Sequence, residues 1–213
     1  MSAENLTLDE LRRHLALRDL TDPTSGPHAI QLLVDAAVEA LQDAWGCEVR
    51  WVRSNPIVSV ADNYDRLRIP ADAISREARY TRYVGRDVML RSHSSAMVPQ
   101  ALRDVAASPS DDVLVVCAGI VYRRDAIDRL HTGTPHQLDL WRVRKGKRLT
   151  LDDLNDMIRR VVAALTPGPR HREVARLHPY TTHGRQVDVE SNGEWVEVCE
   201  CGLAHPDVLI ASG

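Results

Sequence analysis

Charged side chains gather at one turn of the chain, directly after its most apolar stretch. Arg123 and Arg124 follow the apolar run 113–121, and Asp125 and His131 lie in the turn that comes next. A guanidinium fixed at the end of a strand makes charge-assisted, often bidentate hydrogen bonds to phosphate. The residue types therefore indicate a site for a phosphate-bearing polyanion. A solvated loop is the alternative interpretation.

Two strands must hold this turn. The run 113–121 is apolar enough to predict a largely buried strand, and a second strand is predicted from His136 onward. Successive side chains of a strand point to opposite faces, so Gln137 and Asp139 should share one face. The leucines at the next positions should lie on the other face. The result is a hairpin with polar side chains at its mouth and on one side.

The spacing in this hairpin closely resembles motif 2 of class II aminoacyl-tRNA synthetases, most of all the catalytic alpha subunit of phenylalanyl-tRNA synthetases. The chain has YRRD, a histidine eight residues after the first arginine, and then HQLD. The resemblance implies that Arg123 holds the α-phosphate of ATP and that His131 lies near the outer phosphates, as the two catalytic residues. Arg124 and Asp125 would complete the ATP site.

The same resemblance implies an amino-acid site. The segment LRSHSSAMVP is similar to a family stretch in which a histidine and a serine line the pocket, and HPY aligns with two aromatic residues that cradle the substrate ring. The segment CGLAHP is similar to a strand along the pocket floor. The family usually has glutamate where this chain has Asp139. The implied amino-acid-binding residues are His93, Ser95, Gln137, Asp139, His178, Tyr180, Cys201 and Gly202.

His178 and Tyr180 bear on the choice of substrate. An imidazole and a phenol in a closed pocket need hydrogen-bond partners, because unpaired buried polar groups are costly. The sequence therefore suggests a substrate that supplies a partner, such as a hydroxylated or amino-bearing aromatic. The alternative is that both side chains turn outward and other residues form the pocket.

The predicted elements amount to an α+β fold, an antiparallel sheet flanked by helices of the class II synthetase type. We expect one domain over 1–213, with residues 1–25 as an N-terminal extension that carries a short helix. Helical periodicity marks further helices at 28–44 and 150–165. Further strands are predicted at 47–52, 172–177, 185–190 and 194–199. The helix and strand at 28–52 resemble motif 1 and imply a homodimer; an ordinary core helix is the alternative.

Composition narrows the partners and the compartment. The chain has 213 residues, 44% of them apolar, and a net charge of −3 from 27 basic and 30 acidic residues. No global basic field favours DNA, and any RNA contact would need a local patch. The start MSAENLTLDE does not resemble a secretory signal, and no apolar run is long enough for a membrane span. We expect a cytoplasmic protein with reduced thiols and no membrane partner.

Two other kinds of site are weaker alternatives. Cys199 and Cys201 with nearby histidines suggest zinc, but they lack the paired spacing of structural zinc sites, and small apolar cysteines in a core strand fit better. We therefore expect no protein-bound metal. His93 and Ser95 suggest a hydrolase, but neighbours on one strand face rarely align for proton transfer, and there is no nucleophile elbow.

The resemblance implies an ATP- and magnesium-dependent ligase that forms an aminoacyl-adenylate and transfers the amino acid to tRNA. A stand-alone relative that serves a carrier protein or small molecule is one alternative, and a non-catalytic binding relic is another. The given sequence stops at Gly213, before the expected place of motif 3, and the family's tRNA-gripping coiled coil is not in it. We therefore expect either a fragment or a protein that does not need the full ATP site.

Overall fold

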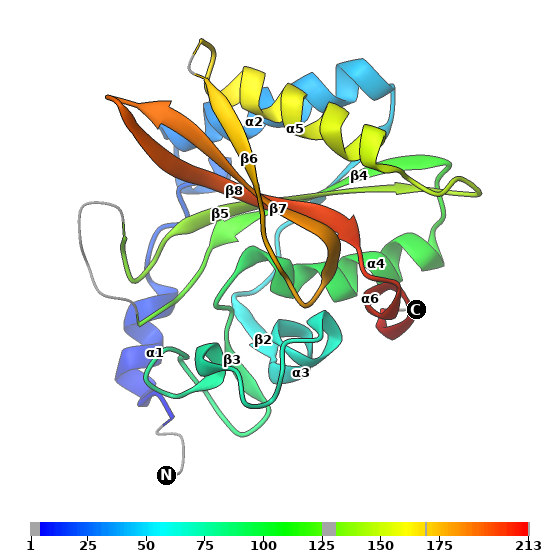
Figure 1. Ribbon diagram of the computed structural model, residues 1–213. Helices are drawn as coiled ribbons and strands as arrows, with labels where there is room; N and C mark the ends of the chain where they lie inside the picture. Colours follow the sequence, from blue (N-terminus) through cyan, green and yellow to red (C-terminus); the bar gives the residue numbers. More distant parts are fainter. Residues whose placement is uncertain (1–4, 125–130, 169, 213) are drawn as a thin grey trace.

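Helices and three small sheets alternate along the chain in the computed structural model, which describes residues 5–124, 131–168 and 170–212 (Figure 1). The helices are α1 (Leu8–Leu15), α2 (Ala29–Trp45), α3 (Val60–Asn63), α4 (Val98–Ala107), α5 (Leu151–Leu165) and α6 (Pro206–Ala211), with 3-10 turns η1 (Pro23–Ser25), η2 (Asp65–Leu67), η3 (Ile74–Arg76) and η4 (Ser94–Met97). The strands are β1 (Glu48–Val52), β2 (Ile57–Ser59), β3 (Val88–Leu90), β4 (Asp112–Ile120), β5 (His136–Arg144), β6 (His171–Ala175), β7 (Thr181–Ser191) and β8 (Glu194–Ala204).

The predicted α+β class is confirmed, with one departure from a wholly antiparallel sheet. The central strand β4 pairs antiparallel with β5, but parallel with β1. Parallel neighbours need a long crossover connection, and residues 53–111 provide it. Strands β2 and β3 form a separate antiparallel pair, and β6, β7 and β8 form a third, antiparallel sheet.

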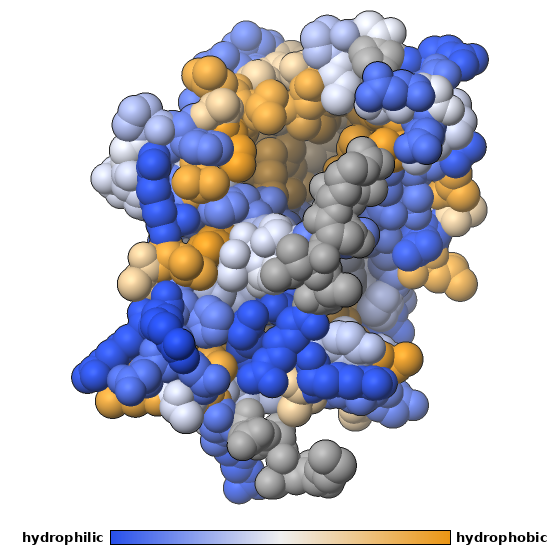
Figure 2. All heavy atoms as spheres, turned by 90° about the vertical axis from the view of Figure 1, so that its left-hand side faces the viewer, coloured by the Kyte–Doolittle hydropathy of each residue, from blue (hydrophilic) through white to orange (hydrophobic). Residues whose placement is uncertain are grey.

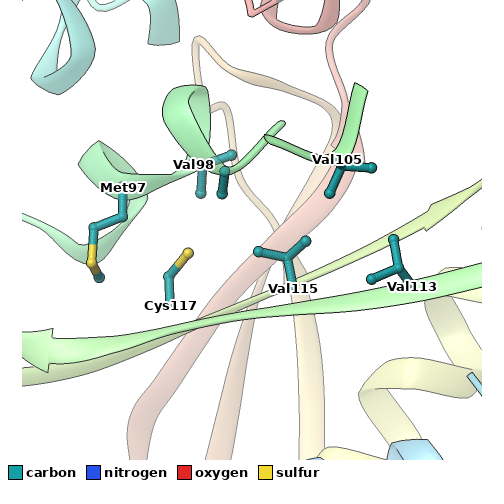
Figure 3. Packing of buried hydrophobic residues seen from close by; sticks show 7 residues of the cluster. Met97, Val98, Val105, Val113, Val115 and Cys117 are labelled. Atoms are coloured by element: carbon teal, nitrogen blue, oxygen red, sulfur yellow. The ribbon is translucent and has the colours of Figure 1, made fainter. Parts of the chain in front are cut away.

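Strand β4 is apolar from Val113 to Ala118 because helices cover both of its faces. On one face, Val113, Val115 and Cys117 pack against η4 and α4, as Figure 3 shows. On the other face, Leu114 and Val116 pack against α2. Alternate side chains of a strand point in opposite directions, so a strand buried on both faces needs apolar residues at every position.

Helix α5 joins the sheet of β4 to the sheet of β7. It begins at a capping box in which the Thr150 hydroxyl accepts from the Asp153 N–H and the Asp153 carboxylate accepts from the Thr150 N–H. Met157 and Val161 pack beside α2 on the first sheet. Leu154, Ile158 and Val162 pack on Val187 and Val189 of the second sheet. α2 and α5 lie next to each other on the same side of the molecule (Figure 1).

The N-terminal residues dock on the end of β4. Leu6 and Leu11 pack against a buried cluster that includes Ile120 and Tyr122. The Asp19 carboxylate accepts from the Ile120 N–H at 3.1 Å, and His136 Nε2 accepts from the Leu20 N–H at 2.9 Å. The division into one domain with an N-terminal extension stays a prediction. No helix in the described residues is long and apolar enough to cross a bilayer.

Several predicted boundaries differ from the structure by a few residues. The first strand begins at Glu48 rather than 47, after Gly46 ends α2 in the left-handed conformation. β7 begins at Thr181 rather than 185, and β8 continues to Ala204 rather than 199. The elements between β1 and β4 were not predicted. All but α4 have only three or four residues, too few to show a periodic pattern, whereas the ten-residue α4 was missed.

Candidate active site

Arg123 follows β4 directly and is held by backbone groups on two sides. Its N–H donates to Gly133 O at 2.8 Å, which closes the base of the turn. Its side-chain Nε donates to Ser92 O at 2.8 Å, in the segment that leads into η4. The guanidinium is therefore fixed by one edge at the mouth of the predicted hairpin.

The other residues predicted to bind ATP are described less fully. The Arg124 N–H donates to Tyr80 O at 3.2 Å, and the Arg124 side chain is exposed. His131 is also exposed, at the point where the described chain resumes. Asp125 lies outside the described residues, so its role in ATP binding stays a prediction.

His93 lies behind Arg123 and is neutral at physiological pH. Burial and the nearby Arg123 charge lower the pKa of His93 to about 4. Its Nε2 lies 2.9 Å from Asn63 O, and because a carbonyl only accepts, Nε2 carries the proton. Asn63 is fully buried and also accepts from the Ser92 N–H at 3.0 Å. Asn63 thus fixes His93 through its backbone carbonyl and, through its side-chain amide, the segment that anchors Arg123.

Asp139 is a partly buried carboxylate on β5. Burial raises its pKa, while the Ser95 side chain and Trp141 act in the opposite direction. The Trp141 Nε1–H donates to Asp139 Oδ1 at 2.8 Å. No ion pair among the described residues involves Asp139. A desolvated carboxylate without a paired cation is a favourable place for a positively charged ligand group.

Gln137 shares the face of Asp139, as the alternation of β5 predicted. Its Oε1 accepts from the Ser94 N–H at 3.0 Å, at the start of η4. Leu138 and Leu140 pack on the opposite face, with the α2 cluster. The prediction that these pairs lie on opposite faces is confirmed.

Tyr180 reaches the same cluster from the connection between β6 and β7. Burial and Asp139 raise the pKa of Tyr180, whereas Arg123 and the Ser95 side chain lower it. The phenol therefore lies within electrostatic reach of both the predicted ammonium-binding carboxylate and the predicted phosphate-binding arginine. Tyr180 therefore lies near both the predicted amino-acid site and the predicted ATP site.

His178 stacks on Tyr180, with ring centroids 5.7 Å apart and planes inclined by 19°. Its side chain is only 7% exposed, so the alternative that both rings turn outward is wrong. Nδ1 lies 3.2 Å from Thr181 Oγ1, and Nε2 lies 3.2 Å from Glu200 Oε2. Glu200 thus lies beside Nε2, but this buried atom makes no hydrogen bond to the described residues, so the hypothesis that the substrate supplies a partner stays a prediction.

Cys201 and Gly202 are not brought into this cluster. Cys201 packs with Cys199 against the α5 side of the sheet, and Cys201 Sγ lies 3.7 Å from Arg185 O. A Cβ on Gly202 would lie 2.7 Å from Thr181 Cβ, so the glycine lets β8 approach β7. Alternation along β8 turns the Cys201 thiol toward α5, so the structure shows packing roles for both residues, and their binding of the amino acid stays a prediction.

The described residues form no metal site beside this cluster. No group of three or more His, Cys, Asp or Glu side chains in the described ranges could hold a metal ion. Burial raises the pKa of Cys199 to about 12 and that of Cys201 to about 11. Burial therefore keeps both thiols protonated at neutral pH.

Three contacts of the site were not predicted from the sequence. Trp141 continues the alternation of Gln137 and Asp139, so the strand pattern already contained the signal for it. Asn63 and the Ser94 N–H gave no comparable signal, because their partners are distant in sequence.

Comparison with known proteins gives a consistent result. Residues 24–213 match the family model described as tRNA synthetases class II core domain (F). The phenylalanine–tRNA ligase alpha subunit of Prochlorococcus marinus (strain MIT 9313) is 30% identical over 197 residues, which cover 92% of this chain and 57% of that protein. The alpha subunit of Nostoc punctiforme is 32% identical over 151 residues, which cover 71% of this chain and 44% of that protein.

A solved structure is similar in fold. The pyrrolysyl tRNA synthetase of Desulfitobacterium hafniense aligns with a TM-score of 0.62 at 15% identity, over 96% of this chain and 68% of that chain. At such low identity the likeness shows the fold alone. The chain spans about half the length of the curated relatives that it matches.

Proposed function

This chain belongs to the class II tRNA synthetase core family, and we propose that its site activates an amino acid with ATP to form an aminoacyl-adenylate. One observation carries the proposal. The segment that leads into η4 contacts both halves of the hairpin: Arg123 Nε donates to Ser92 O, and the Ser94 N–H donates to Gln137, which shares the face of Asp139 on β5. Asp139 and Arg123 also both act on the pKa of Tyr180, so an anionic and a cationic group lie near the same phenol. An α-amino acid bound there would place its ammonium at Asp139 and its carboxylate toward Arg123.

The chemistry needs no general base. A carboxylate oxygen of the amino acid attacks the α-phosphorus of ATP, and a new O–P bond forms. The bond between that phosphorus and the oxygen bridging to the β-phosphate breaks, and pyrophosphate leaves with the bonding electrons. The amino-acid carboxylate is already ionised at neutral pH, so no proton has to be removed.

Arg123 would stabilise the charge that develops on the α-phosphate. Its hydrogen bond to Ser92 O fixes the guanidinium in advance, which lowers the reorganisation needed in the transition state. Arg124, Asp125 and His131 would contact the other phosphates, as the resemblance implies. Magnesium would be held mainly by the phosphates, because the described residues offer no cluster of metal-binding side chains.

His93, Ser95 and Gln137 would complete the amino-acid site around Asp139. We infer that the activated group passes to a tRNA, since relatives of this chain are named phenylalanine–tRNA ligases. We also infer a homodimer through α2 and the edge strand β1. Leu32, Leu33 and Trp51 support this, because their exposures of 71%, 50% and 42% leave large apolar side chains in solvent.

Amino-acid-dependent exchange of labelled pyrophosphate into ATP tests the proposal, with all twenty amino acids and magnesium present. We expect exchange with aromatic amino acids. Phenylalanine and tyrosine should differ by less than about 100-fold, because Thr181 and Glu200 already lie beside the polar atoms of His178. A preference above ~10³-fold for tyrosine would instead support a hydrogen bond to the substrate side chain. No exchange with any amino acid, from a folded protein, would contradict the function.

A further inference from the structure

A chain of contacts connects α1 to the backbone of Arg123. Arg82 lies at its centre: Nη2 donates to Arg123 O at 3.0 Å, and Nη1 donates to His14 Nε2 at 3.0 Å. An arginine can only donate, so His14 Nε2 must be the unprotonated acceptor. One planar guanidinium therefore bridges α1 and the residue proposed to hold the α-phosphate.

α1 itself is firmly placed. The Thr7 hydroxyl and the Glu10 side chain form a capping box at its first turn. The Leu6 N–H donates to Tyr83 O at 2.7 Å, next to Arg82 in the chain. The His14 ring meets the Tyr122 ring edge-on at 5.7 Å, and the Tyr122 hydroxyl donates to His14 O at 3.3 Å. His14 thus contacts Arg82, which donates to the Arg123 carbonyl, and also Tyr122, which precedes Arg123 in the chain.

The surroundings leave Arg82 little freedom. It is partly buried, and burial together with the Arg124 charge lowers its pKa. A Cβ added at Gly133 would lie 3.2 Å from Arg123 O and 3.6 Å from Arg82 Nη2, so the turn is packed closely there. Figure 2 views the side of the molecule that carries α1, where hydrophilic residues dominate the lower half. The contacts of Arg82 therefore add specific hydrogen bonds to the apolar packing of Leu6 and Leu11 that holds α1.

We propose that His14 and Arg82 are positioning residues, through which α1 sets the backbone and side chain of Arg123 for ATP. Residues 5–23 precede the part of the chain that matches the family model, so this support comes from outside that part. The proposal rests on the proposed function, in which Arg123 binds the α-phosphate. Neither His14 nor Arg82 has to touch ATP.

The test compares His14→Ala, His14→Gln, Arg82→Lys and the control Arg12→Ala, an exposed residue of the same helix. Losing one hydrogen bond to a charged group should raise the KM for ATP about tenfold in His14→Ala and leave the amino-acid KM unchanged. Glutamine offers a carbonyl oxygen to Arg82, so His14→Gln should recover most of the loss. Arg82→Lys keeps the positive charge but loses the two-pronged guanidinium that bridges His14 and Arg123. Its KM values should therefore resemble those of His14→Ala.

Hydrogen–deuterium exchange of the free protein makes the result independent of catalysis. The amides of Arg123 and Arg124 bond to Gly133 O and Tyr80 O, and they should exchange faster in His14→Ala and Arg82→Lys than in Arg12→Ala. Faster exchange in a protein that forms no adenylate would support the positioning role of His14 and Arg82 and would refute the proposed formation of an adenylate. If both variants fold and show unchanged exchange and an unchanged KM for ATP, the proposed positioning role of His14 and Arg82 is wrong. If His14→Ala does not fold, Arg82→Lys decides by the same two measurements.

Discussion

At the scale of single residues, the proposed chemistry depends on Asp139, the carboxylate that we propose binds the ammonium group of the amino acid. Its carboxylate accepts from Trp141 and interacts with Ser95, yet burial still raises its pKa. Hydrogen bonds from neutral donors therefore do not fully compensate the loss of water. A bound ammonium would complete the compensation, because an opposite charge at short range favours the ionised form.

We predict that Asp139→Asn raises the KM for the amino acid by about 100-fold and changes the KM for ATP little. The substitution keeps the shape of the side chain but removes the charge that would face the ammonium. Asp139→Glu keeps the charge and should be affected much less. Steady-state pyrophosphate exchange measures both constants, and equal changes in the two would argue for a structural role of Asp139.

His178 and Tyr180 mark a limit of inference from residue types. The sequence identified both rings as inward-facing candidates and correctly treated their polar atoms as needing partners. It could not show that Thr181 and Glu200 lie beside His178, since Glu200 comes from the next strand. Because the buried Nε2 of His178 makes no hydrogen bond to the described residues, the substrate preference drawn from unpaired polar atoms stays a prediction.

At the scale of elements, the end of β4 is shaped around a buried arginine. Arg91 is 2% exposed; its Nε donates to Ile120 O at 2.8 Å and its Nη1 to Ser54 O at 3.1 Å. Asp19 Oδ2 lies 3.9 Å from Nη2. The strand passes this guanidinium at Gly119, where a Cβ would overlap Nη2 and lie 3.1 Å from Cζ. A larger residue at position 119 would displace the Arg91 guanidinium from its buried position.

We predict that Gly119→Ala lowers the free energy of unfolding by ~2 kcal/mol or more, because overpacking displaces a buried charge. Gly46→Ala is the matched control. Gly46 has a φ of 61° but no atom within 4 Å of a built Cβ, so only backbone strain of about 1 kcal/mol is expected. Urea unfolding of both variants measures the difference. A Gly119→Ala protein as stable as the Gly46→Ala protein would contradict this role of Arg91.

The elements that sequence could predict are those with a repeated pattern. The opposite faces of β5 followed from strict alternation, and the long helices α2 and α5 followed from helical periodicity. The parallel direction of β1 could not be predicted, because it depends on the path of the connection rather than on local residues. The packing of Cys199 and Cys201 in a core strand was expected from their small apolar side chains, whereas the role of Cys201 in the amino-acid site came from the family resemblance alone.

At the scale of the whole molecule, the stability should depend on pH through buried neutral histidines. The folded pKa of His93 is about 4, below its ordinary value of 6.5. Between these values the unfolded chain binds a proton that the folded chain does not, so stability falls as pH falls through this window. Burial likewise lowers the pKa of His14 and of His136.

We predict that His93→Gln reduces the fall in Tm between pH 6.5 and 4, because glutamine has no proton to gain. The contribution of His93 should be ~2–3 kcal/mol at the acid end of the window. His171→Gln is the control, since His171 is exposed at the start of β6. Differential scanning fluorimetry across the window measures all three proteins. Parallel Tm curves for wild type and His93→Gln would mean that His93 is not held neutral.

The docking of the N-terminal residues is a property of the whole molecule that the sequence concealed. Asp19 bonds to Ile120, and His14 bonds to Arg82, across separations of 101 and 68 residues. No local pattern encodes such contacts. The hairpin that presents Arg123, Gln137 and Asp139 could be predicted from local spacing. The contacts of His14 and Arg82 that support Arg123 could not.

The most direct test of adenylate formation is pyrophosphate exchange by Arg123→Ala, compared with wild type and with Arg170→Ala. Arg170 is an exposed arginine that pairs with Glu190 on the third sheet, so its loss controls for a changed surface charge. With folding checked by circular dichroism, Arg123→Ala should lose about 100-fold or more of the amino-acid-dependent exchange, and Arg170→Ala should keep it. Exchange by Arg123→Ala at the wild-type rate would contradict the proposal that this site forms an aminoacyl-adenylate.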